Sequence, residues 1–264
     1  MTRAISGVVY VFLFIAAILF NEISYTILIV VFGGICLWEF SRLIDSKNIF
    51  SFILFPATIY YFTYHITEKQ ILIVSGLTFL CYIRLMYHLY SGEKKKYPVT
   101  FFGKLDMSIR YIIFPFSFLS LIPVASGEYE SKIIISILVF IWVNDSFAYI
   151  VGSNFGKNKL FEQVSPKKTT EGFFGGWAFT LIAAYIVSVY YYTESTIELM
   201  DWMLIASVIS IFGTVGDLVE SKFKRQANKK DSGTIMPGHG GLLDRLDSLY
   251  YIAPFVYLYF HYVI

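Results

Sequence analysis

Long apolar runs separated by short polar segments dominate the chain. Nine of these runs approach the roughly 20 residues that a membrane-spanning helix needs. They cover residues 5–20, 23–40, 49–64, 71–90, 109–125, 133–152, 173–192, 202–216 and 246–264. The pattern predicts an all-α, polytopic integral membrane protein with about nine transmembrane helices. We divide it into residues 1–130, with about five helices, and residues 131–264, with about four helices and the polar motifs described below.

The distribution of Lys and Arg predicts an orientation, because these residues accumulate in cytoplasmic loops. With the N-terminus inside, 19 of the 21 Lys and Arg residues fall at or beside the inner ends of the predicted helices. Only Lys69 and Lys132 fall outside, and the outer loops carry acidic residues instead. We therefore predict a cytoplasmic N-terminus and an outer C-terminus.

Composition changes this picture little and excludes some functions. Charged residues make up 15% of the chain, below the roughly 25% of soluble domains, which again indicates a membrane protein. A net charge of +2, without a separate basic patch, argues against nucleic acid as a partner. Cys36 and Cys81 lie far apart inside apolar runs, so we interpret them as core or lipid-facing residues.

Polar residues interrupt the sixth run and dominate the loop after it. Asp145 lies within apolar sequence, where an ionised group is costly and needs compensation. The following loop contains Lys167, Lys168 and Glu171 in the segment SPKKTTEG. These residues are candidates for a binding site, although a purely structural interpretation, a topology anchor with interhelical hydrogen bonds, stays open.

A second polar motif follows the eighth run. If that helix continues past Gly216, then Asp217, Ser221 and Lys224 lie at i, i+4 and i+7, on one face. After a break at residues 237–241 a new helix is expected, with Asp244 and Asp247 on a shared face. The two carboxylate faces could meet at the membrane boundary.

The chemistry of these side chains favours a phosphate-bearing ligand with a metal. Clustered carboxylates suit a hard divalent cation such as Mg²⁺, which completes its shell with water and phosphate. Cationic side chains nearby could neutralise phosphate oxygens, and they are Lys224, Arg225, Lys230 and Arg245. The PGHGG turn offers backbone N–H groups before a helix, a possible anion site. Together these features predict phosphoryl or nucleotidyl transfer at the inner membrane face.

The segment SKFKRQANKKDSGTIMPGHGGLLDRLD, residues 221–247, resembles the signature of the phosphatidate cytidylyltransferases, or CDP-diacylglycerol synthases. Every spaced position of the signature is filled, and Met236 is a conservative departure before the proline. The segment from Asn144 through SPKKTTEG is also similar to the family. The first five runs resemble it only in their hydrophobic character.

The resemblance implies an all-helical membrane enzyme, usually a homodimer, that converts CTP and phosphatidic acid into CDP-diacylglycerol and pyrophosphate. It implies Mg²⁺, with K⁺ as a candidate neighbouring ion, in a bacterial plasma membrane with the site facing the cytoplasm. Asp217 and Asp244, with Asp247, are the implied metal ligands, and Lys224 and Arg225 complete the catalytic set. The implied substrate-binding residues are Ser221, Lys230, Asp231, His239, Gly240, Gly241, Arg245, Asp145, Lys167, Lys168 and Glu171.

Two other functions fit parts of the pattern. A CTP-dependent lipid kinase, or a transferase acting on an isoprenoid alcohol or phosphate, would use the same metal and triphosphate chemistry with another acceptor. A cation transporter would also place carboxylates in broken helices, but near the bilayer midplane and in both halves of the chain. The concentration of charge at one edge of the C-terminal half disfavours the transporter.

Overall fold

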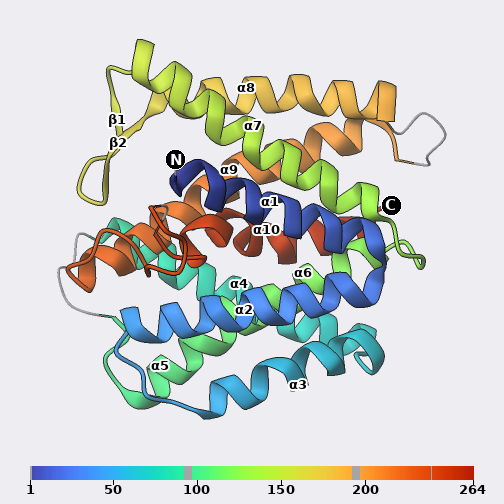
Figure 1. Cartoon of the computed structure of the whole chain (residues 1–264), viewed down its shortest axis with the longest axis vertical. Helices are drawn as coiled ribbons and strands as arrows, with labels where there is room; N and C mark the ends of the chain where they lie inside the picture. The colour runs from blue at the N-terminus through green and yellow to red at the C-terminus, as the bar shows by residue number, and fades with distance from the viewer. Residues whose placement is uncertain (1, 92–96, 192–196, 239) are drawn as a thin grey trace.

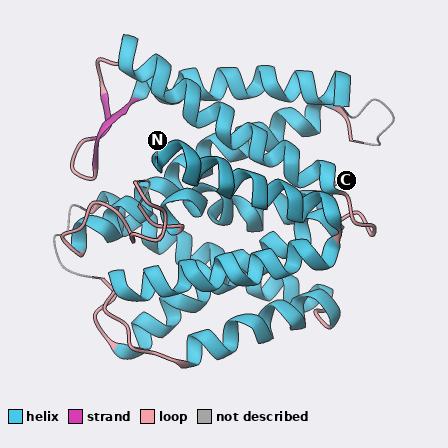
Figure 2. Cartoon of the chain, in the orientation of Figure 1, coloured by secondary structure: helices cyan, strands magenta, loops and turns pink. Residues whose placement is uncertain are grey.

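The computed structural model describes residues 2–91, 97–191, 197–238 and 240–264, with the backbone alone for residues 2–5. The described residues form a bundle of helices with a small hairpin (Figures 1 and 2). In the first half the elements are α1 (Thr2–Phe20), α2 (Glu22–Leu43), α3 (Phe50–Tyr64), α4 (Glu68–Tyr90), α5 (Phe101–Met107), η1 (Ser108–Ile113), α6 (Phe114–Leu121) and η2 (Ile122–Val124). In the second half they are α7 (Ser131–Phe155), β1 (Lys159–Phe161), β2 (Ser165–Thr169), α8 (Thr170–Ile186), η3 (Val187–Tyr191), α9 (Leu199–Gln226) and α10 (Leu243–Tyr262).

The helices confirm a helical membrane protein. Within the described ranges, six helical segments are long and apolar enough to cross a membrane by length and composition, and α1 and α3 are shorter apolar helices. These six are Glu22–Leu43, Glu68–Tyr90, Phe101–Val124, Ser131–Phe155, Thr170–Tyr191 and Leu199–Gln226. The remaining described helix, α10, begins with charged residues, and most of its residues are buried. Nine crossings therefore stay a prediction.

Successive helices run back and forth between two ends of the bundle (Figure 1). One end, which we call the site end, holds the β1–β2 hairpin and the α9–α10 loop, and the N-terminus lies toward it. The opposite end holds the C-terminus and the α6–α7 connection. This alternation agrees with the predicted division into inner and outer loops. Which end of the bundle faces the cytoplasm stays a prediction.

Helix α10 lies at the centre of the bundle and packs on both α9 and α6, so it joins the two halves of the chain. Its aromatic residues stack on neighbouring helices, with ring centroids 3.9 Å apart for Tyr82 and Tyr251 and 4.0 Å apart for Phe212 and Phe255. On α9, Gly216 makes room for this packing, because a Cβ there would lie 2.7 Å from the Cβ of Tyr251. Close packing of this kind holds membrane helices together.

Small residues bring α7 and α8 together. A Cβ on Gly172 would lie 2.6 Å from the carbonyl oxygen of Ala148, and one on Gly176 would lie 2.7 Å from that of Asn144. Helix α8 starts at a side-chain cap, in which Thr169 accepts a hydrogen bond from the backbone N–H of Gly172. The close pairing fixes the strand that precedes α8 beside the end of α7.

The loop between α7 and α8 differs from the all-α prediction, because it forms an antiparallel hairpin of β1 and β2 (Figure 2). The register pairs Lys159 with Thr169 and Phe161 with Ser165. A loop of this length outside the helices must satisfy its own backbone hydrogen bonds, and a hairpin does so locally. Val164 at the turn is buried, and its carbonyl oxygen accepts a hydrogen bond from Arg225 Nε on α9, at 3.3 Å.

Candidate active site

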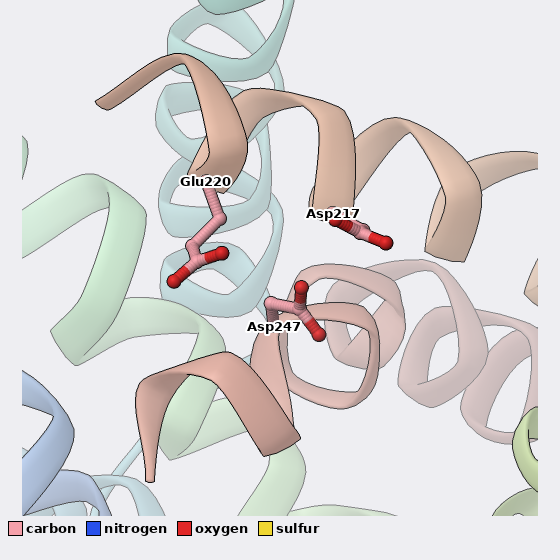
Figure 3. Close-up of side chains that lie close together, drawn as sticks. All are labelled: Asp217, Glu220 and Asp247. Carbon is pink, nitrogen blue, oxygen red and sulfur yellow. The ribbon is translucent and has the colours of Figure 1, made fainter. Parts of the chain in front are cut away.

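Three carboxylates converge where α9 crosses α10 at the site end (Figure 3). Asp217 and Glu220 come from α9 and Asp247 from α10, and one ligand atom from each lies within 4.8 Å of the others. The i, i+3 spacing places Asp217 and Glu220 on one face of α9. The predicted meeting of two carboxylate faces is thus present for Asp217 and Asp247, with Glu220 as an additional member.

Helix α9 reaches this crossing because its sequence specifies both of its ends. Glu198 and Asp201 form a reciprocal cap at its start, and it continues past Gly216 as predicted. Lys224 and Arg225 lie in its last turn, where positive charge complements the negative end of the helix dipole. Asn228, just beyond the end, adopts a left-handed conformation with φ of 54° that terminates the helix.

The three carboxylates are buried to different degrees and are only partly satisfied. Glu220 is fully buried; its Oε1 has no partner among the described residues, and its Oε2 pairs with the ammonium group of Lys224. Asp217 accepts one from Ser221 Oγ at 3.2 Å, and Asp247 accepts one from the N–H of Ser248 at 2.7 Å. Buried carboxylates are costly unless a cation neutralises them, so this cluster requires positive charge.

Two lysines supply part of that charge. Lys224 Nζ contacts both Glu220 Oε2 and, at 2.8 Å, Asp244 Oδ1. Lys168 Nζ lies 2.6 Å from Asp217 Oδ2, so the SPKKTTEG segment meets the α9 motif directly. Burial alone would lower the pKa of Lys168, but the attraction and hydrogen bond of Asp217 outweigh burial and raise that pKa. Lys168 is therefore a cation at neutral pH.

Asp244 lies beside the three-carboxylate cluster and has a different set of partners. Its carboxylate accepts hydrogen bonds from the N–H of Gly241 at 2.7 Å and of Ser232 at 3.0 Å, besides the contact with Lys224. It therefore ties the α9–α10 loop to the start of α10. The N–H of Gly241, which the sequence suggested for phosphate, donates to this carboxylate in the structure.

The donor set fits a hard divalent cation. Lys168 pairs with Asp217, and Lys224 pairs with Glu220 and Asp244, while Asp247 lies beside Asp217 and Glu220. Four negative and two positive groups leave a formal charge of −2. Oxygen ligands of this kind are those that Mg²⁺ prefers. The buried Oε1 of Glu220, which has no partner among the described residues, is a further indication that a cation belongs here.

Other predicted site residues surround the cluster or support the loops. Five of the predicted residues are exposed: Asp145, Lys167, Lys230, Asp231 and Arg245. The charge of Asp145 acts on both Lys168 and Asp217, which places it near the cluster. Gly240 has φ of 93°, in the region that favours glycine, and lies next to Asp231. His239 lies outside the described residues.

Two predicted residues hold the hairpin in place. Glu171 accepts hydrogen bonds from the N–H groups of Lys157, at 3.1 Å, and Asn158, at 3.2 Å, and from Asn158 Nδ2 at 2.7 Å. Arg225 donates to the carbonyl oxygens of Val164 and Lys229. In this structure both side chains organise loops around the cluster, and their predicted contacts with substrate stay predictions.

Two acidic residues that sequence reasoning missed lie at this end of the bundle. Glu220 was detectable, because it shares the helical face of Asp217 and Lys224 at i+3 and i−4. Glu39, on α2, contacts the start of α10 from 204 positions away in the chain. In the sequence, Glu39 stands out only as a carboxylate inside an apolar run.

Comparison with known proteins extends this picture over almost the whole chain. Residues 1–263 match the sequence profile of a family described as the cytidylyltransferase family. A phosphatidate cytidylyltransferase of Bacillus subtilis (strain 168) is 32% identical over 266 residues, which cover 97% of this chain and 95% of the relative. Proteins of the same name from Staphylococcus saprophyticus and Staphylococcus haemolyticus are 41% identical over 154 residues and 45% over 114 residues. These matches cover 56% and 43% of this chain and 55% and 43% of the relatives.

Proposed function

The chain belongs to the cytidylyltransferase family, and from this premise we propose that it transfers CMP from CTP to phosphatidic acid. The products are CDP-diacylglycerol, a precursor in phospholipid biosynthesis, and pyrophosphate. The observation that carries the proposal is the cluster of Asp217, Glu220 and Asp247, paired with two lysines at the end of a membrane-spanning helix. A lipid phosphate and a soluble nucleotide could both reach such a position.

The reaction needs positioning and charge stabilisation more than proton transfer. An oxygen of the phosphatidate phosphate attacks the α-phosphorus of CTP, a new P–O bond forms, and the bond from the α-phosphorus to the bridging oxygen breaks. Pyrophosphate leaves with the electron pair. A phosphate monoester has a second pKa of about 6 and is already a nucleophilic anion at neutral pH. A general base is therefore unnecessary, and we assign His239 no such role.

The residues that would hold a divalent cation are Asp217, Glu220 and Asp247, with Asp244 close by. We propose Mg²⁺, which when bound neutralises charge on the phosphates. A K⁺ ion nearby is a further prediction from the family resemblance. Comparing activity in potassium and sodium salts at fixed Mg²⁺ tests the requirement for K⁺.

Lys168 and Lys224 have a second task in this proposal. Each ammonium group neutralises a carboxylate in the structure as it stands. With substrates bound, the same ammonium groups would donate hydrogen bonds to phosphate oxygens. Arg245, exposed near the cluster, is the third candidate for phosphate contact.

We further propose that the site end faces the cytoplasm of a bacterium, where CTP is available. Cysteines introduced at Asn158 and Glu128 test this orientation, because these residues lie in loops at the two ends of the bundle. In intact cells an impermeant thiol reagent is expected to label Glu128→Cys alone, and Asn158→Cys only after the membrane is opened. The reverse labelling contradicts the orientation.

The family resemblance also implies a homodimer. Measuring the mass of the detergent-solubilised protein by light scattering, after subtraction of the detergent, tests this directly. A protein mass of two chains supports the dimer, and a mass of one chain contradicts it.

The activity itself is tested with purified protein, labelled CTP and a panel of phosphorylated and hydroxylated lipids. We expect label from the α-phosphate to enter a lipid product only with phosphatidic acid, with one pyrophosphate released for each product. Transfer of the γ-phosphate to a hydroxylated lipid would instead identify a lipid kinase and contradict the proposal.

A further inference from the structure

Glu39 is a fully buried carboxylate that reaches the α9–α10 loop from α2. It lies one turn before the end of that helix at Leu43, among apolar neighbours in the sequence. Its Oε2 accepts hydrogen bonds from the N–H of Leu243 at 2.8 Å and from Ser232 Oγ at 3.3 Å. A residue of the first half of the chain thus contacts the polar motif of the second half.

The contact with Leu243 makes Glu39 a cap supplied by another helix. Leu243 is the first residue of α10, and amides of a first helical turn have no partner inside the helix. A carboxylate at that position also interacts favourably with the positive end of the helix dipole. Asp244 performs the corresponding task from within α10, by accepting from Gly241. Ser232 joins both carboxylates, with its N–H to Asp244 and its hydroxyl to Glu39.

Glycines allow the loop to approach Glu39 this closely. A Cβ on Gly233 would collide with Glu39 Oε1 and lie 2.8 Å from Cδ. One on Gly241 would lie 2.5 Å from Oε2 and collide with Ser232 Oγ. Neither glycine has a φ in the left-handed region, so the need for glycine here is steric. The last glycine of the PGHGG turn, Gly241, is explained by contact with Glu39.

The geometry at the start of α10 determines where its carboxylates lie. Asp247 follows Leu243 by four residues, about one helical turn, so a shift of the first turn moves Asp247 relative to Asp217 and Glu220. We propose that Glu39 is a positioning residue, which holds the start of α10 so that Asp247 meets the two carboxylates of α9. The consequence for turnover rests on the proposed function, whereas the consequence for the loop and for cation binding does not.

The test compares Glu39→Gln and Glu39→Asp with Glu22→Gln, a control at the opposite end of the same helix. For Glu39→Gln we expect kcat to fall roughly 10-fold, the scale of one hydrogen bond to a charged group. The Mg²⁺ concentration for half-maximal rate is expected to rise, while KM for phosphatidic acid stays unchanged. Glu39→Asp keeps the charge on a shorter side chain and is expected to lie between wild type and Glu39→Gln. Glu22→Gln is expected to match wild type.

Two readouts that need no catalytic activity separate this inference from the proposed function. Hydrogen exchange of residues 240–246 is expected to accelerate in Glu39→Gln while α9 stays protected, and Mn²⁺ binding without substrates is expected to weaken. If both changes occur in a protein without cytidylyltransferase activity, the positioning role holds and the proposed function fails. If kcat, Mg²⁺ dependence, exchange and Mn²⁺ affinity all match wild type in folded Glu39→Gln, the inference is wrong.

A second variant guards against loss of folding in Glu39→Gln. Gly233→Ala keeps the Glu39 carboxylate but places a methyl group against it, which displaces the carboxylate. This variant is therefore also expected to raise the Mg²⁺ concentration for half-maximal rate. Glu39→Ala removes the group that this methyl meets. In the double variant the alanine at 233 is therefore expected to cost much less than it does alone. Strictly additive effects would show that residue 233 acts independently of Glu39 and would overturn the inference.

Discussion

The two ends of the α9–α10 pair use carboxylates in opposite ways. At the opposite end, Asp201 accepts hydrogen bonds from Tyr259 Oη and from the N–H of Glu198, each at 2.8 Å. Glu68 there accepts from Tyr262 Oη at 2.7 Å and lies 3.0 Å from His261 Nε2. At the site end, by contrast, Glu220 is fully buried, its Oε1 has no partner in the part of the chain that is described, and its Oε2 pairs with Lys224.

The difference shows what each end is built to do. Hydroxyl, imidazole and backbone groups contact the carboxylates of the opposite end, so these side chains join helices without an added cation. The site end gathers more negative than positive charge around buried oxygens, which is costly without an added cation. At the opposite end the protein's own donors satisfy Asp201 and Glu68, whereas at the site end part of the negative charge stays without a protein cation.

The largest expected effect comes from the cluster. Asp217→Asn and Asp247→Asn keep the side-chain size but remove charge that a cation needs, so each is expected to lower kcat at least as much as loss of an oxyanion-hole donor. Such a loss costs about 10²- to 10³-fold. CDP-diacylglycerol formation in detergent, across a Mg²⁺ titration, measures it.

Asp201→Asn, on the same helix at the opposite end, is the matched control and is expected to keep wild-type turnover. Lys222→Gln is a second control, because Lys222 projects about 100° or more around α9 from Asp217, Ser221 and Lys224. Folding of each variant is checked by elution as a discrete oligomer. Folded Asp217→Asn or Asp247→Asn with more than about a tenth of wild-type turnover would show that the cluster is structural.

A smaller effect is expected from the adjacent lysines of β2. Lys168 contacts Asp217, whereas Lys167 is exposed. Lys168→Gln loses a hydrogen bond between charged groups, and we expect kcat/KM for CTP to fall about 10-fold or more, the scale of such a bond. Lys167→Gln, one position away, is expected to have a markedly smaller effect. Equal losses in the two variants would mean that the segment acts only through its net charge.

The smallest effect on turnover is expected from Glu68→Gln. This change weakens the contacts of Glu68 with His261 and Tyr262 between α4 and the end of α10. We expect a lower thermal midpoint with kcat unchanged, because the cluster lies at the other end of α10. Thermal unfolding in detergent and the same transfer assay measure the two quantities. A loss of turnover without loss of stability would break the division between the two ends.

The sequence alone predicted much of this arrangement. Apolar runs located the helices, and the spacing of Asp217, Ser221 and Lys224 predicted their shared face, which the hydrogen bond between Asp217 and Ser221 confirms. The positive charges of the SPKKTTEG segment suggested a second loop at the site, and the pair of Lys168 with Asp217 brings it there. These predictions succeeded because they depend on local periodicity and on motifs with regular spacing.

The remaining features depend on contacts between distant parts of the chain. Glu39 contacts Leu243, which lies 204 positions away in the chain. The residues around Glu39 in the sequence give no sign of this contact. Asp244 lies apart from the cluster because its carboxylate accepts hydrogen bonds from the N–H groups of Gly241 and Ser232. Its spacing along the helix does not predict these partners. The hairpin is stabilised by Arg225 and Glu171 on neighbouring helices, so the intervening loop sequence did not reveal it.

The most direct test of the account is Mn²⁺ binding to the purified protein without substrates, followed by electron paramagnetic resonance. Wild type is expected to bind Mn²⁺ at a saturable site, and folded Glu220→Gln is expected to lose that site or bind at least about 10-fold more weakly, as the loss of one charged ligand interaction implies. Asp201→Asn is expected to match wild type. If folded Glu220→Gln binds Mn²⁺ with the stoichiometry and affinity of wild type, the cation does not lie between Asp217, Glu220 and Asp247.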